Sequence, residues 1–71
     1  MLESKRYRVK DDLELMFNNG NDLIAVSYKK DDIVQLEIDD SVLSVVTVQY
    51  DNYVAVYKKF EFNKYFERVE D

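Results

Sequence analysis

Carboxylates are the side chains of this sequence that could do chemistry, and they are concentrated in its middle. Residues 11–51 carry ten acidic and two basic side chains, whereas residues 1–10 carry four basic and one acidic side chain. Two carboxylates can act as general acid and general base when they face each other and are partly buried. Neighbours such as Asp31 and Asp32 point to opposite faces of a strand or lie solvated in a turn. The spacing therefore indicates no catalytic pair, and we do not expect an enzyme.

Other common site chemistries need residue types that the chain lacks. It has no His, Cys, Pro or Trp, which removes the ordinary zinc ligands, the thiol nucleophile, the Ser–His pair and the disulfide. Its one glycine cannot build a Gly-rich phosphate-binding loop. No array of Asp and Asn has the spacing of a calcium-binding loop. We expect no catalytic residues, no metal and no cofactor.

An acidic segment can instead bind a basic partner. Alternate residues on one strand face lie about 6.6–6.8 Å apart and neighbouring strands about 4.8 Å apart. DNA carries one charge per roughly 1.7 Å of its axis, so a sheet fringed with carboxylates would present a sparser array of the same sign. A basic DNA-binding groove could accept such an array. The candidate partner-binding residues are Asp11, Asp12, Glu14, Asp31, Asp32, Glu37, Asp39, Asp40 and Asp51.

Many of these carboxylates also have a simpler interpretation as turn formers. Asp is favoured in turns because its side chain hydrogen-bonds nearby backbone amides. The sequence leaves open whether the acidic residues bind a partner or only form turns and a solvated surface. The residues at expected turns are Asp22, Asp31, Asp32, Asp39, Asp40 and Asp51.

The element that carries the first of these carboxylates alternates like a strand. Apolar side chains occupy most odd positions of residues 6–17, which predicts a long strand with one buried face, bent at Asp11–Asp12. A helix over residues 11–18 is the alternative, because Asp11 and Glu14 resemble a capping box and Gly20 could end it. The residues that follow, 18–21, have the composition of a hairpin turn, which favours the strand.

The rest of the chain predicts an antiparallel meander. We expect strands at residues 22–29, 33–39, 42–50 and 53–62, the first of them central because it is apolar on both faces. In the last strand, Phe60 and Phe62 share the phase of Val54 and Val56, which predicts that they face the core. A short C-terminal helix should begin at Asn63. Residues 1–71 thus form one mainly β (α+β) domain of about five strands, either an open twisted sheet or a small barrel.

Two alternatives to partner binding remain. A core of this size rarely supplies more than about 3–5 kcal/mol, and residues 42–50 are apolar on both faces, so the chain could be a β assembly module that forms a homodimer. It could also bind nucleic acid through Lys5–Lys10 and Lys58-Lys59, which lie among aromatic residues. The net charge of −5 weighs against this second alternative.

The chain shows no signal for a membrane or for export. Its longest apolar runs are a few residues, against roughly 20 needed to cross a bilayer. No apolar segment follows the basic residues near the N-terminus, as a signal peptide would require. We therefore expect a cytoplasmic protein without a membrane partner.

In size, composition and acidic middle, the chain resembles the small host-takeover proteins of bacteriophages, in particular the DNA-mimic inhibitors. These families include inhibitors of uracil-DNA glycosylase and of the histone-like nucleoid protein HU. The resemblance is one of type, and it rests on the nine candidate carboxylates in a β-rich chain without Cys or His. It implies an inhibitor that occupies the DNA-binding site of a basic host protein in the host cytoplasm, and among such proteins HU is the partner we expect first. Such an inhibitor binds the protein and not the nucleic acid.

Overall fold

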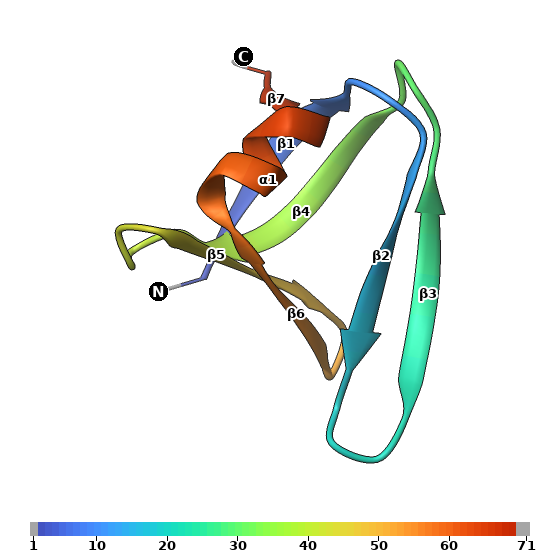
Figure 1. The fold of residues 1–71 in the computed structure, drawn as a ribbon, viewed down its shortest axis with the longest axis vertical. Coiled ribbons are helices and arrows are strands. Elements are labelled where there is room, and N and C mark those ends of the chain that lie inside the picture. Colours follow the sequence, from blue (N-terminus) through green and yellow to red (C-terminus); the bar gives the residue numbers. More distant parts are fainter. Residues whose placement is uncertain (1, 70–71) are drawn as a thin grey trace.

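The computed structural model describes residues 2–69, which form one antiparallel sheet and one short helix (Figure 1). The strand order is β3-β2-β6-β5-β4-β1-β7, and the sheet is open, with β3 and β7 at its two edges. The predicted mainly β fold is confirmed. The elements are β1 (Glu3–Val9), β2 (Leu13–Asn18), β3 (Leu23–Tyr28), β4 (Ile33–Asp39), β5 (Val45–Tyr50), β6 (Tyr53–Lys58), α1 (Lys59–Tyr65) and β7 (Phe66–Arg68).

Four of the strands form one long hairpin that bends near its middle. Arg8 pairs with Ile33 between β1 and β4, and Leu13 pairs with Tyr28 between β2 and β3, so both ladders keep the same register. The predicted bent strand over residues 6–17 is therefore confirmed as β1 and β2, and the helix alternative is wrong. The predicted strand over residues 6–17 is present as two strands, and β7 was not predicted, which explains why seven strands are present where about five were predicted.

A bulge produces the bend. Val9 donates its N–H to the carbonyl of Asp32 at 2.9 Å, and its own carbonyl accepts the N–H of Asp31 at 2.8 Å. Asp31 and Asp32 thus both oppose Val9, and such a bulge bends the strand and increases its twist. Residues 10–12 then oppose only residues 29–30, which restores the register beyond the bend. Asp31 has a φ of 74°, a conformation that Asp tolerates better than most residues.

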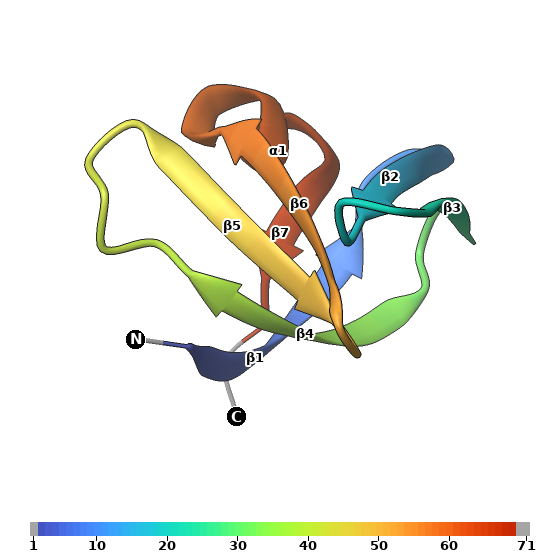
Figure 2. The same ribbon diagram turned by 90° about the horizontal axis from the view of Figure 1, so that it is seen from below.

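The sheet curls around its core because β2 and β6 diverge. Their ladder consists of the single pair Asn18–Val54. Figure 2 shows the curl, in which β4 lies on one side and α1 on the other. The divergence leaves an opening between β2 and β6, and this opening is part of the candidate binding site.

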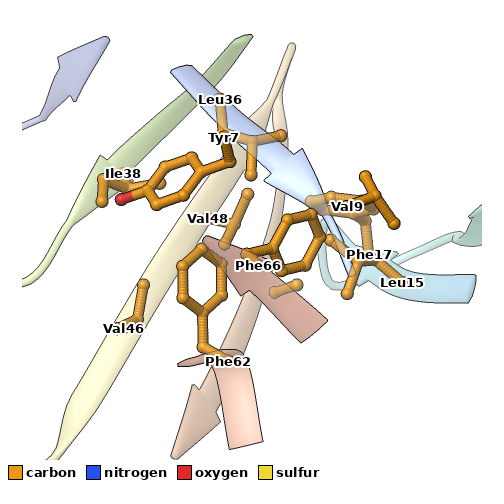
Figure 3. Packing of buried hydrophobic residues seen from close by; sticks show 11 residues of the cluster. Tyr7, Val9, Leu15, Phe17, Leu36, Ile38, Val46, Val48, Phe62 and Phe66 are labelled. Carbon is orange, nitrogen blue, oxygen red and sulfur yellow. The ribbon is translucent and has the colours of Figure 1, made fainter. Parts of the chain in front are cut away.

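Aromatic rings fill the centre of the core. The ring of Phe62 lies 5.2 Å from that of Tyr7, edge to face, and stacks on Phe66 at 4.7 Å. Figure 3 shows these three rings converging around Val48. Burial raises the pKa of the Tyr7 hydroxyl. The buried residues are Tyr7, Val9, Leu15, Phe17, Leu36, Ile38, Val46, Val48, Ala55, Phe62 and Phe66.

The C-terminal part differs from the sequence prediction in phase and in boundaries. Strand β6 ends at Lys58, and α1 begins at Lys59 and not at Asn63. The face of β6 that packs against the core carries Tyr53, Ala55 and Tyr57. Val56, on the opposite face, is therefore 62% exposed, and Phe60, in α1, is 68% exposed. The prediction failed because β6 is apolar on both faces, so periodicity alone does not tell which face packs against the core. Phe62 is buried as predicted, but from the helix.

Two strand predictions also need correction. Strand β3 is an edge strand and not a central one, since it lies at one end of the strand order, and one of its faces is exposed. Strand β5 begins at Val45, because residues 42–44 form a turn in which Leu43 is 90% exposed. This turn is held where the N–H of Lys59 donates to the carbonyl of Ser44 at 2.9 Å.

Candidate binding site

The structure does not gather the nine candidate carboxylates on one face. Four lie at the bend of the long hairpin, two follow one another at the far end of β4, and the other three line two openings of the core. The groups in this order are Asp11, Asp12, Asp31 and Asp32; then Asp39 and Asp40; then Glu14, Glu37 and Asp51.

The four carboxylates at the bend all have local partners that shape the turns. Arg8 donates from Nη1 to Asp31 at 3.0 Å. The other three accept backbone N–H groups: Asp11 from Asp12 at 2.9 Å, Asp12 from Lys30 at 2.8 Å, and Asp32 from Lys29 at 3.3 Å. Lys10, Lys29 and Lys30 lie in the same turns, so the bend carries almost as many cations as anions. These observations support the turn-former interpretation for this group.

Asp39 shapes the loop that leaves β4. Its Oδ1 accepts the hydroxyl of Ser41 at 2.6 Å and the backbone N–H of Ser41 at 3.0 Å. These hydrogen bonds favour the charged carboxylate and lower the pKa of Asp39 from 3.8 to about 2. Because the pKa of Asp39 is lower in the folded than in the unfolded protein, its charged carboxylate stabilises the fold at pH values above about 4. This contribution is lost as the pH falls from about 4 to about 2.

We expect the substitution Ser41→Ala to raise the pKa of Asp39 towards its ordinary value, because the hydroxyl is the largest cause of the shift. Carboxyl-carbon NMR titration would measure this change directly. Asp40, whose pairing with Lys5 does not involve Ser41, serves as the internal reference. An unchanged titration of Asp39 in the variant would show that the hydroxyl does not hold the charge.

Three basic residues near the start of the chain, Lys5, Arg8 and Lys10, have partners within the molecule. Lys5 Nζ lies 3.3 Å from a carboxylate oxygen of Glu3 and 3.3 Å from one of Asp40. Arg8 bridges Asp31 and Glu67, at 3.0 and 3.4 Å. Lys10 Nζ donates to the carbonyl of Asn63 at 3.1 Å. These cations therefore stabilise the β1 side of the fold and are not presented as an open basic arm.

A cleft of about 330 Å³ opens where β2 and β6 diverge, with α1 at its end. The N–H of Met16 donates to Tyr57 Oη at 3.0 Å across this opening. Because alternate residues of a strand direct their backbone groups to the same side, Glu14 also turns its N–H and C=O toward the cleft. The cleft is lined by Asp12, Leu13, Glu14, Leu15, Tyr57, Glu61, Phe62, Tyr65 and Phe66.

A second opening, a groove of about 400 Å³, lies between β3 and the strands β4 and β5. Glu37 and Asp51 line it, with the buried ring of Phe17 at its floor. Tyr28 lines the groove as well, and burial is the main cause that raises the pKa of its hydroxyl, followed by Tyr50. Among residues 2–69, no Lys or Arg lines either the cleft or the groove.

The outer face of the sheet carries apolar side chains that nothing in the described chain covers. The pairs Asn18–Leu23 and Asn18–Val54 place β3, β2 and β6 side by side there. We call the four exposed side chains of this face the outer row; they are Leu23, Met16, Val54 and Val56.

The structure adds two negative findings for residues 2–69. No group of three or more His, Cys, Asp and Glu is arranged so that it could hold a metal ion. None of the helical segments found there has the length and apolar character of a membrane span.

Comparison with known proteins found no matching family model, no similar curated protein and no similar solved structure. The function must therefore be argued from the residues and their geometry.

Sequence analysis missed part of the cleft. Glu61 was not a candidate, and Tyr57 was considered only as a neighbour of two lysines. A helix beginning at Lys59 would have been the signal, since it places Glu61 and Tyr65 four positions apart on one helix side. Because residues 53–62 were predicted to form a strand, the helical spacing of Glu61 and Tyr65 was not considered.

Proposed function

We propose that this protein is a small acidic binding protein that occupies the DNA-binding surface of a basic protein. The observation that carries the proposal is the number of candidate carboxylates that no cation of the described chain neutralises. Cations of β1 are held in internal ion pairs, whereas six of the nine candidate carboxylates have no ion pair among residues 2–69. These six are Asp11, Asp12, Glu14, Asp32, Glu37 and Asp51.

Inhibition would be steric and electrostatic, without a chemical step. A phosphate-binding groove attracts an acidic surface by its field, and the bound protein then excludes DNA from the same groove. The resemblance in type to DNA-mimic inhibitors makes HU the first partner to test, in the cytoplasm where that protein meets DNA. The nucleic-acid alternative has less support, because Lys5, Arg8 and Lys10 have partners within the molecule.

We expect the protein to displace duplex DNA from HU at low salt and to lose affinity steeply as salt rises. Exposed charges are screened within about 10 Å at 0.1 M salt, so affinity should fall at least about tenfold between about 0.05 M and about 0.5 M salt. Fluorescence anisotropy of labelled DNA would measure the displacement. Affinity that does not change with salt, or direct binding of this protein to duplex DNA, would contradict the proposal.

The outer row favours a second candidate function, assembly with another copy of the chain. Its four apolar side chains lie on neighbouring strands on either side of Asn18, and Leu23 and Val56 are both more than 60% exposed, so a second copy could cover them. Analytical ultracentrifugation separates the two functions. Self-association that strengthens with salt would favour assembly, whereas a monomer that binds HU at low salt would favour the acidic binding protein.

A further inference from the structure

We propose that the cleft between β2 and α1 takes an arginine side chain from the partner protein. This inference rests on the proposed function, because it names the contact by which an acidic binding protein would anchor a basic partner. It starts from the walls of the cleft, which are apolar and aromatic, and not from its charges alone. Tyr57 and Tyr65 line it together with Leu13 and Leu15.

The size of the cleft fits one side chain. A volume of about 330 Å³ lies at the lower end of the range for ligand pockets, roughly 300–1,000 Å³. The hydrogen bond from the N–H of Met16 to Tyr57 Oη, at 3.0 Å, ties the Tyr57 side chain of the cleft to β2. A deep interface anchor has these properties, since hot-spot residues fill well-packed pockets.

The charge around the cleft selects a cation. Asp12, Glu14 and Glu61 line it, and none of the three has an ion pair among the described residues. Within that same part of the chain, no Lys or Arg lines the cleft. An apolar side chain would contact only the walls, whereas a basic side chain would also pair with these exposed carboxylates.

Aromatic walls favour arginine over lysine. A guanidinium group stacks on aromatic faces and pairs with carboxylates through a planar set of donors, while its methylene stem packs on apolar surface. The ring of Tyr65 already has the ammonium group of Lys64 5.8 Å from its centroid, so a cation can approach this aromatic side chain.

A short peptide with one arginine between glycines, compared with the same peptide carrying neutral citrulline, tests the inference. We expect the arginine peptide to shift the ring NMR signals of Tyr57 and Tyr65 saturably, and the citrulline peptide to bind at least about tenfold more weakly. The double variant Glu14→Gln/Glu61→Gln should weaken arginine binding at least about fivefold. The double variant Glu3→Gln/Asp22→Asn, which also changes the net charge from −5 to −3, should stay within about twofold.

The outcomes separate this inference from the proposed function. Equal binding of both peptides, shifts confined to other residues, or equal effects of the two double variants would overturn the arginine site. If HU binds the Glu14→Gln/Glu61→Gln variant as well as the parent, the cleft is not the anchor although the function stands. If the arginine peptide binds in the cleft but neither HU nor another basic DNA-binding protein does, the arginine site stands and the proposed function fails.

Discussion

Replacing Phe17 by alanine should unfold most of the protein at room temperature. Phe17 is fully buried, and its ring lies 5.7 Å from that of Tyr50 across the core. Truncating a buried Phe to Ala costs about 3–5 kcal/mol. A domain of this size rarely has more than about 3–5 kcal/mol of net stability, so the loss is as large as the whole. Circular dichroism with thermal and urea denaturation would measure it.

Phe60→Ala is the matched control, because it removes the same ring from a position that is 68% exposed. Such a surface substitution should change the free energy of unfolding by no more than about 0.5 kcal/mol. The pair of variants also tests the phase of the C-terminal segment. If Phe60→Ala destabilised the protein as strongly as Phe17→Ala, Phe60 would face the core and the description of β6 and α1 would be wrong.

The second large effect concerns binding. Neutralising Asp32, Glu37 and Asp51 together, as Asp32→Asn, Glu37→Gln and Asp51→Asn, should weaken binding to HU by well over tenfold, mainly through slower association. None of the three has an ion pair among residues 2–69. Asn also tolerates the φ of 56° at position 51, so the fold should survive. Stopped-flow association rates beside circular dichroism would measure both properties.

A second triple variant controls for net charge. Glu3→Gln, Asp22→Asn and Glu67→Gln also change the charge from −5 to −2 but lie outside the nine candidate positions. We expect this variant to slow association by less than about threefold, since it reduces the general field outside the candidate contact, although it also removes the ion pairs of Glu3 with Lys5 and of Glu67 with Arg8. Two folded triple variants that bind equally well would show that the named carboxylates are not the contact. A first variant that binds like the parent would leave these residues as turn formers.

The sequence predicted the first half of the fold better than the second. Near-strict alternation over residues 6–17, broken only at Asp11 and Met16, has one apolar face, so the period decides both the element and its buried side. In β6 both faces are apolar, and periodicity cannot choose between Val56 and Tyr57. The helix start at Lys59 also lacks a side-chain cap, so the usual signal for an N-terminus was absent. Packing of Phe62 against Tyr7 decides that boundary, and this contact joins residues distant in sequence.

Prediction of the site was limited for a related reason. The charge count identified the acidic middle segment, residues 11–51. It could not distinguish carboxylates that accept hydrogen bonds from local N–H groups from carboxylates that line the cleft or the groove. That division depends on the bulge at Asp31 and on the divergence of β2 from β6, and both are properties of paired strands. Glu61 was not a candidate because it matters only through its position in the cleft beside Tyr57 and Tyr65. Tyr57 lies on β6 and Tyr65 on the same helix as Glu61, so their proximity depends on the fold.

The long bent hairpin reduces the loss of chain entropy that accompanies the pairing of β7 with β1. The pair Asn18–Leu23 closes a separation of 5 residues, whereas Val9–Phe66 joins residues 57 apart. For a free chain, the longer loop costs roughly 2 kcal/mol more to close. Once Arg8 is paired with Ile33, however, only the 33 residues from Ile33 to Phe66 remain to be closed, which lowers that cost by roughly 0.5 kcal/mol. Formation of the hairpin thus shortens the loop that must close before β7, which follows α1 in the chain, can pair with β1.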